Sequence, residues 1–132
     1  MLADAGFCDN RVKRLATINF DDERGLLCPI DFTDHGFSVV RAFTISGTLG
    51  AVRGGHAHRL GRQILMLVSG LIEIEIRWKE RLERLQLDPL NRVLLIEPLV
   101  WSRQIYRGDH SSMVVFCDTA YDPSDYILEV EA

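Results

Sequence analysis

The chain of 132 residues is long enough to bury one hydrophobic core and too short for two substantial lobes, so we expect a single domain over residues 1–132. Its hydrophobic fraction of 47% and charged fraction of 26% are those of an ordinary globular protein and exclude a disordered or fibrous chain. A formal net charge of -4 argues against nucleic acid as a partner, because nonspecific binding to phosphates requires a basic face.

Two further features bear on where the protein works. No apolar run approaches the roughly 18–20 residues of a membrane span, and the first residues lack the charged-then-apolar order of a signal peptide, so we expect no membrane partner. Cys8, Cys28 and Cys117 are odd in number and share no C-x-x-C spacing, which is typical of reduced thiols. The sequence therefore predicts a cytoplasmic protein.

The N-terminal part of the chain carries the pattern of short strands. Residues 1–10 are predicted to be a loose terminus, after which VKRLATINF begins a strand near Val12. The segment DDERG supplies a turn and LLCPIDF resumes an extended pattern, so a hairpin is expected there. Residues 34–58 are rich in β-branched and aromatic residues and are broken by glycines, which favours short strands and leaves little room for helix.

The C-terminal part continues the strand pattern. The segment ILMLVSGLIEIEIRW predicts a hairpin that turns at Ser69-Gly70, with the isoleucines of LIEIEI facing the core and its glutamates facing water. RLERLQLDP predicts a strand, with a helix over residues 78–87 as the alternative. NRVLLIEPLVW and SSMVVFCDTAY are predicted to be buried strands joined by the loop RQIYRGDH. In YDPSDYI, Pro123 after Asp122 predicts a short helical turn capped by the aspartate.

Closely spaced strands without helical periodicity predict an all-β fold, a small antiparallel barrel or jelly roll of about nine or ten strands. Such a barrel leaves a mouth for one ligand. In RGGHAH, His56 and His58 are two residues apart, so on a strand their imidazoles point the same way and are expected to form one site. Imidazole can take and return a proton near neutral pH. The alternative is that both histidines are hydrogen-bonded polar residues of the barrel wall.

The spacing around these histidines is similar to the first sequence motif of the cupins. Gln63 stands where that motif has a glutamate, and Gly70 stands where it has a glycine. No histidine lies near Pro98, where the second cupin motif would bring a further ligand. A divalent metal held by two imidazoles normally needs an anionic or a third imidazole ligand. We therefore expect no metal and no other cofactor, and an acid–base chemistry that proceeds without metal.

Longer strings extend the resemblance from about Val12 to Ile127. RGGHAHRLGRQ, with DDERGLL, SVVRAFTI, EPLVW and YDPSDYI around it, resembles the sugar-nucleotide 3,4-ketoisomerases, small cupins that act on thymidine-diphosphate-linked 4-keto-6-deoxyglucose. The resemblance implies a metal-independent isomerase that moves a ketone from carbon 4 to carbon 3 through an enediol-like intermediate. It further implies a role in deoxysugar biosynthesis, for a cell-surface polysaccharide or a secondary metabolite, and a homodimer.

The resemblance also implies roles for individual residues. By position in the motif, His58 matches the principal acid–base residue and His56 the partner beside it. Arg53 and Arg41 match arginines near the sugar or the diphosphate, where charge-assisted hydrogen bonds would anchor the ligand and stabilise an enolate. Either arginine could instead pair with a carboxylate. Gln63 is expected to line the same cavity as an orienting hydrogen-bond group.

The sequence departs from the family at two positions. Phe43 and Thr44 stand where family members usually have a tyrosine, and Ser102 stands where many have a histidine after the tryptophan. A phenylalanine cannot carry a proton, so Tyr106 or a water is a candidate for the second transfer. Trp101 is expected to wall the pocket or stack on a base, or else to belong to the core.

Two other functions remain open on the sequence. One is a metal-dependent cupin isomerase or dioxygenase that uses both histidines and an unusual third ligand. The other is a non-catalytic cupin that binds a sugar nucleotide. Metal content distinguishes the first from a metal-free isomerase, and binding without turnover distinguishes the second.

Overall fold

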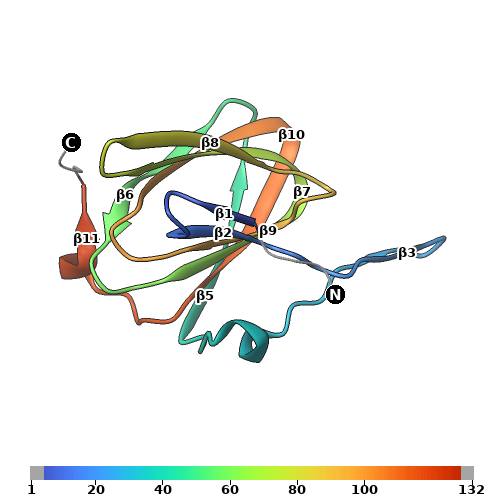
Figure 1. The fold of residues 1–132 in the computed structure, drawn as a ribbon. Helices are drawn as coiled ribbons and strands as arrows, with labels where there is room; N and C mark the ends of the chain where they lie inside the picture. Colours follow the sequence, from blue (N-terminus) through green and yellow to red (C-terminus); the bar gives the residue numbers. More distant parts are fainter. Residues whose placement is uncertain (1–4, 129–132) are drawn as a thin grey trace.

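The computed structural model describes residues 5–128, which form antiparallel strands curled around a common interior (Figure 1). The strands are β1 (Ala5–Phe7), β2 (Val12–Leu15), β3 (Phe20–Asp22), β4 (Gly25–Leu27), β5 (Arg41–Gly47), β6 (Val52–His58), β7 (Gln63–Trp78), β8 (Arg81–Leu87), β9 (Val93–Ile96), β10 (Trp101–Cys117) and β11 (Tyr126–Ile127). Two 3₁₀ turns, η1 (Phe32–His35) and η2 (Pro123–Asp125), complete the described elements. The predicted all-β jelly-roll fold is confirmed. Within residues 5–128, no helix is long and apolar enough to cross a membrane.

Two long strands, β7 and β10, are shared by both sheets of the roll. Their first and second halves pair with each other in antiparallel register, so that the N-terminal half of one lies beside the C-terminal half of the other. One sheet adds β8 and β6 to this pair, and β11 pairs with β6. The other adds β9, β2 and β1 on one side and β5 on the other. β5 pairs with the second half of β10 and β6 with its first half. Because β10 bends between these halves, the two sheets that contain β5 and β6 enclose one interior.

The predicted hairpin at Ser69-Gly70 and the predicted loop RQIYRGDH are both wrong. Gly70 and Gly108 have φ values of 81° and 79°, and at these points β7 and β10 bend together and pass from one sheet to the other. The side chain of Ser111 bridges the bend, since its Oγ accepts from the backbone N–H of Leu71 and donates to the carbonyl of that residue. The Ser69-Gly70 pair therefore marks a bend within one strand and not a reversal of the chain, because both halves of β7 pair with β10.

The N-terminus is more ordered than the sequence predicts. Of the predicted loose segment 1–10, residues 1–4 lie outside the described residues, while β1 pairs with β2. The turn between them consists of Cys8, Asp9 and Asn10, whose φ values of 51°, 54° and 64° lie in the left-handed region. Because none of these residues is glycine, the turn carries no strong signal in the sequence.

Three smaller expectations can be compared with the structure. The hairpin at DDERG is confirmed as the pair β3 and β4, which stands apart from the other strands in Figure 1. The strand expected over VKRLATINF ends at Leu15, however, and residues 16–19 separate it from β3. RLERLQL is the strand β8, so the alternative helix over residues 78–87 is wrong. The turn η2 is capped by Asp122, whose side chain accepts from the backbone N–H of Ser124 at 3.0 Å.

The isoleucines of β7 face the core as predicted, but its opposite face is less exposed to water than predicted. Ile72, Ile74 and Ile76 are fully buried. Glu75 was expected to face water, yet only 5% of it is exposed. Arg103 lies opposite on β10 and donates to both carboxylate oxygens of Glu75, at 2.7 and 2.8 Å. Long arginine side chains of the neighbouring strand thus cover the outer face of the sheet.

Replacing Gly47 with alanine is expected to lower the free energy of unfolding by about 1–3 kcal/mol, because overpacking a filled core costs that much. A Cβ atom at Gly47 would overlap the ring of Tyr106, which is fully buried. Urea denaturation measures the effect, with replacement of the exposed neighbour Ser46 by alanine as the control. A Gly47→Ala variant as stable as the wild type would contradict this packing.

Candidate active site

The two histidines of β6 lie side by side, as the strand periodicity predicts. The ring centroids of His56 and His58 are 5.0 Å apart. Tyr126 of β11 pairs with His58 in register, and its ring lies 4.6 Å from that of His56 and 4.7 Å from that of His58. The short strand β11 therefore closes one side of the histidine pair with an aromatic wall.

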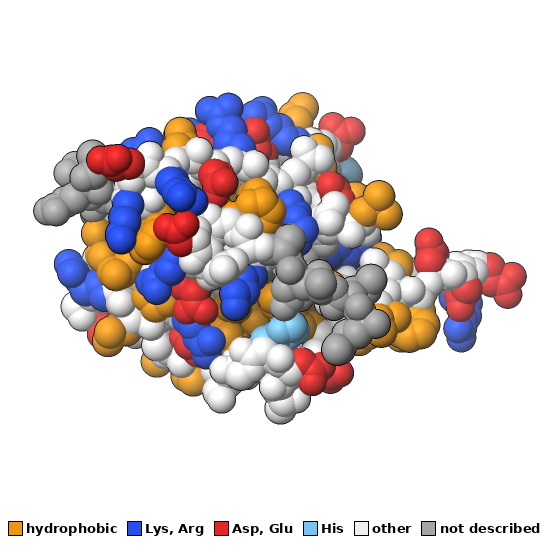
Figure 2. Space-filling view, in the orientation of Figure 1, with side chains coloured by type: hydrophobic (Ala, Val, Ile, Leu, Met, Phe, Trp, Pro, Cys, Tyr) orange, Lys and Arg blue, Asp and Glu red, His pale blue; other side chains and the backbone are white. Residues whose placement is uncertain are grey.

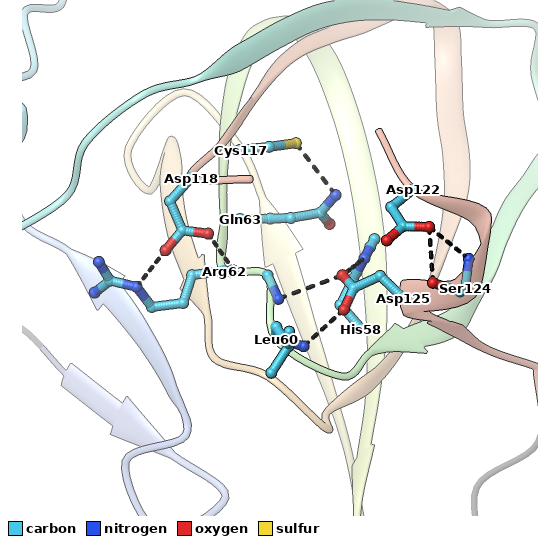
Figure 3. A network of polar contacts seen from close by, with 10 residues as sticks. His58, Leu60, Arg62, Gln63, Cys117, Asp118, Asp122, Ser124 and Asp125 are labelled. Atoms are coloured by element: carbon cyan, nitrogen blue, oxygen red, sulfur yellow. Dashed lines mark hydrogen bonds and ion pairs between the residues drawn. The ribbon is translucent and has the colours of Figure 1, made fainter. Parts of the chain in front are cut away.

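His58 forms a dyad with Asp125 (Figure 3). The His58 Nδ1 atom lies 3.2 Å from Oδ2 of Asp125, and both side chains are largely buried. Because a carboxylate can only accept, the neutral imidazole carries its proton on Nδ1 and its lone pair on Nε2. Nε2 of His58 is buried and has no hydrogen-bond partner among residues 5–128. It is therefore a free basic nitrogen of the kind that general-base catalysis requires.

The backbone around Asp125 fixes this carboxylate in place. Its Oδ1 accepts from the backbone N–H of Leu60 at 2.8 Å, and its Oδ2 accepts from that of Gly61 at 3.3 Å. The Asp125 carbonyl in turn accepts from the backbone N–H of Arg59 at 2.8 Å. The segment after His58 thus wraps the aspartate from both sides, which orients the imidazole without help from a ligand.

A cavity of about 220 Å³ opens beside the histidines, and its lining comes from both sheets. The lining residues are Arg41, Phe43, Ile45, Arg53, Gly54, His56, Gln63, Gln104, Val115 and Tyr126. A smaller pocket, which His58 and Asp125 line, shares Arg41, Gln63 and Tyr126 with it. The volume is below the roughly 300–1,000 Å³ of pockets that enclose a drug-sized ligand, so a larger ligand would extend from the cavity to the surface.

The structure brings together five of the predicted site residues: Arg41, Arg53, His56, His58 and Gln63. The guanidinium of Arg41 lies over the ring of Phe43 at 4.8 Å and over that of Tyr121 at 5.0 Å. The Gln63 amide nitrogen donates to Sγ of Cys117 at 3.6 Å. Two cationic side chains and an amide therefore surround the cavity beside the histidines, which suits an anionic ligand.

Trp101 and Tyr106 lie elsewhere. The Trp101 ring lies under the guanidinium groups of Arg77 and Arg103, at 5.5 and 5.9 Å, and does not line the cavity. Tyr106 is fully buried behind the cavity wall, where its hydroxyl donates to Oε1 of Gln104 at 3.5 Å. Burial raises the pKa of Tyr106 to about 12, so its hydroxyl stays protonated at neutral pH.

Sequence reasoning missed Asp125, Tyr126 and Gln104. The first two follow the predicted turn at Pro123 directly, but only the pairing of β11 with β6 brings them to the histidines. Gln104 belongs to the segment that was predicted to be a loop, where the side-chain direction could not be inferred. Asp125 carries no local signal that sets it apart, since it is the second aspartate of YDPSDYI and the first one caps the turn.

His56 is held in a neutral state by its surroundings. Burial lowers its pKa below the ordinary value of 6.5, and the nearby His58 lowers it further, whereas a hydrogen bond to the backbone of Gly54 acts in the opposite direction. The unfolded chain therefore binds more protons than the folded chain near and below pH 6.5.

From this sign we expect the free energy of unfolding to fall as the pH drops through 6.5, because His56 must be protonated in the unfolded chain first. The variant His56→Gln removes this titration and is expected to show a shallower dependence. Urea denaturation of both proteins between about pH 5 and 7.5 makes the comparison. Identical slopes in the two proteins would contradict the assignment to His56.

The side chains near the histidines do not form a set of metal ligands. No group of three or more His, Cys, Asp or Glu residues within the range 5–128 lies close enough to hold a metal ion. At the position where the cupin motif has a carboxylate, the structure has the Gln63 amide, and Asp125 is engaged by Nδ1 of His58.

Comparisons with known proteins relate nearly the whole chain to sugar-nucleotide 3,4-ketoisomerases. Residues 8–132 match the family model "FdtA: WxcM-like, C-terminal". The TDP-4-oxo-6-deoxy-alpha-D-glucose-3,4-oxoisomerase of Aneurinibacillus thermoaerophilus is 29% identical over 119 residues, which cover 86% of each chain.

Solved structures with the same fold include several 3,4-ketoisomerases. The sugar 3,4-ketoisomerase QdtA from Thermoanaerobacterium thermosaccharolyticum, in complex with TDP, has a TM-score of 0.82 and 26% identity, and the match covers 90% of this chain and 88% of that one. The TDP-quinovose 3,4-ketoisomerase WlaRB from Campylobacter jejuni has a TM-score of 0.76 and 25% identity, covering 89% and 91%.

Proposed function

Because the chain belongs to the FdtA (WxcM-like, C-terminal) family and is an isomerase, we propose that it converts a nucleotide-linked 4-keto-6-deoxyhexose, of the TDP-4-keto-6-deoxyglucose type, into its 3-keto isomer without a metal. The observation that carries the proposal is the His58–Asp125 dyad, whose free Nε2 belongs to a residue of the pocket that adjoins the cavity. QdtA binds TDP, and the Aneurinibacillus relative is named for a TDP-4-oxo-6-deoxyglucose, which supports this substrate class.

In this proposal His58 moves the proton between the two carbon atoms. Nε2 of His58 takes the proton from carbon 3, which leaves an enediolate over carbons 3 and 4, and Asp125 stabilises the imidazolium that forms. The imidazolium then returns the proton to carbon 4. Because the same nitrogen removes the proton from carbon 3 and delivers it to carbon 4, no second side chain is needed to protonate carbon 4.

The oxygen-bound proton must also move, from the hydroxyl on carbon 3 to the oxygen on carbon 4. His56 lines the cavity, and its lowered pKa keeps it neutral and able to accept at neutral pH. It accepts the proton of the carbon 3 hydroxyl and passes it to the neighbouring oxygen as the carbon–oxygen double bond shifts. Phe43 at the cavity wall has no transferable proton and is not required by this route.

The arginines supply the charge that the nucleotide and the enediolate need. Arg41 and Arg53 both line the cavity, and a guanidinium binds a diphosphate or an enolate oxygen through charge-assisted hydrogen bonds. The contacts of the Arg41 guanidinium with two aromatic rings limit its freedom, which reduces the entropic cost of holding an anion.

The decisive experiment incubates EDTA-treated protein with TDP-4-keto-6-deoxyglucose in deuterated water and follows the sugar by proton NMR. A new 3-keto species supports the proposal, and protium carried from carbon 3 to carbon 4 supports the single-histidine route. Product that forms only after iron, manganese or zinc is added back would overturn the metal-independent reaction. Tight TDP binding without product under either condition would make the protein a binding module.

A homodimer and a cytoplasmic location are part of the same proposal. The β3–β4 hairpin protrudes from the body of the molecule (Figure 2), and Ile18, Phe20 and Leu27 on or next to it are more than half exposed. A second copy of the chain would cover these apolar side chains. Sedimentation of the wild type and of Phe20→Glu tests this, since a monomeric wild type would overturn the dimer. The three cysteines are free, which suits a reducing compartment.

A further inference from the structure

Gln104 occupies a position that the reaction described above leaves without a role. It lies on β10, opposite Arg53 of β6 and Ile74 of β7, and only 8% of the residue is exposed. Its side chain lines the cavity together with those of His56 and Arg53. A neutral amide at such a place is costly to bury unless its donors and acceptor find partners.

The acceptor of this amide is already engaged. Tyr106 lies two residues further along β10 and therefore on the same face of the strand, and its hydroxyl donates to Oε1 of Gln104. Within residues 5–128, Gln104 is the single hydrogen-bond partner of the Tyr106 hydroxyl. A phenol that stays protonated donates to an amide oxygen and not to an amide nitrogen, so the contact sets which end of the Gln104 amide faces it.

The donor end of the amide has space because of a glycine. Gly54 on the neighbouring strand has a φ of 85°, and a Cβ atom there would lie 3.1 Å from Nε2 of Gln104. The NH₂ group thus lies against the backbone of β6 at Gly54, two residues before His56, and it has no protein acceptor among residues 5–128. Tyr106 and Gly54 together hold an unpaired N–H donor at the cavity wall.

We propose that Gln104 donates a hydrogen bond from Nε2 to the keto oxygen of the sugar, and that Tyr106 is the positioning residue that aims this donor. The inference rests on the ketoisomerase reaction proposed above. As the proton leaves carbon 3, negative charge develops on the oxygen of carbon 4, and a fixed neutral donor stabilises that charge more than it stabilises the substrate ketone. Gln104 therefore accelerates the reaction without taking part in proton transfer.

The test compares kcat and KM of the wild type with those of Gln104→Leu, Tyr106→Phe and the double variant, using the sugar nucleotide as the probe. Gln104→Leu is expected to lower kcat by roughly 10²–10³-fold with little change in KM, as the loss of one oxyanion donor does. Tyr106→Phe keeps the buried ring and is expected to lower kcat about 10-fold. Gln86→Leu, at an exposed position of β8, is the matched control and should retain wild-type kcat.

The double variant separates positioning from a structural role. If Tyr106 acts through Gln104, adding Tyr106→Phe to Gln104→Leu lowers kcat no further, so the two effects are strongly non-additive. A further 10-fold loss in the double variant would overturn the positioning role, and a Gln104→Leu enzyme within about threefold of the wild type would overturn the donor role. A wild type without turnover would refute the ketoisomerase reaction itself, which distinguishes that failure from either of these.

Discussion

The variant His58→Ala is expected to lower kcat by roughly 10²–10⁴-fold, because a general base contributes about that much to a proton-transfer reaction. Nε2 of His58 is the free nitrogen of the dyad, and alanine leaves no basic atom in its place. The affinity for TDP is expected to stay within a few-fold of the wild type, since the cationic groups of the cavity are Arg41 and Arg53. Single-turnover NMR measures the rate, and calorimetry with TDP measures binding.

A chemical rescue makes this prediction specific to the imidazole. Imidazole added to His58→Ala is expected to restore part of the rate, whereas a variant that is merely misfolded would not respond. His110→Ala, at an exposed position of β10, is the matched control and should keep the wild-type rate. Turnover of His58→Ala within a few-fold of the wild type would remove His58 from the role of base.

The period of the strand was sufficient to predict the pair of histidines, but not the aspartate that completes the dyad with His58. Residues two apart on a strand share a face, and that rule alone places His56 and His58 together. Asp125 lies 67 residues away from His58, and no local pattern connects the two. Their contact depends on β11, which has only two residues, and so short a strand carries no recognisable alternation.

The errors in the fold prediction have the same physical origin. Ser69-Gly70 and the segment around Gly108 carry the residues of tight turns, and a single left-handed glycine is compatible with either a reversal or a bend. The pairing of β7 with β10 on both sides of the bend decides between them, and that information lies in a distant part of the chain. Because the sequence predicts a loop for RQIYRGDH, the inward direction of Gln104 could not be anticipated, and Tyr106 was expected at the ligand and not in the core.

The variant Asp125→Asn is expected to lower kcat by roughly 10²–10⁴-fold, as the loss of the orienting carboxylate does in serine-protease triads. The asparagine keeps the volume of the aspartate and one oxygen for the backbone N–H of Leu60. Its NH₂ group, however, can donate to Nδ1 of His58, which would place the imidazole proton on Nε2 and remove the lone pair that must accept from carbon 3.

Asp118→Asn is a closely matched control for this variant. Asp118 also accepts a backbone N–H, that of Arg62 at 2.7 Å, and its second oxygen pairs with the guanidinium of the same residue at 2.8 Å. This ion pair lies beside the dyad (Figure 3) but contains no group of the proposed reaction. We expect Asp118→Asn to lower the thermal stability and to leave kcat unchanged, whereas Asp125→Asn lowers kcat.

Nitrogen-15 NMR of the His58 ring shows which ring nitrogen carries the proton, and a loss of stability alone would not change this. In the wild type, the shifts should report a proton on Nδ1, and in Asp125→Asn they should report a proton on Nε2. A variant that keeps the wild-type tautomer and the wild-type rate would show that Asp125 only braces the loop after His58. A changed tautomer with a lowered kcat would instead show that the carboxylate selects the nitrogen on which the base operates.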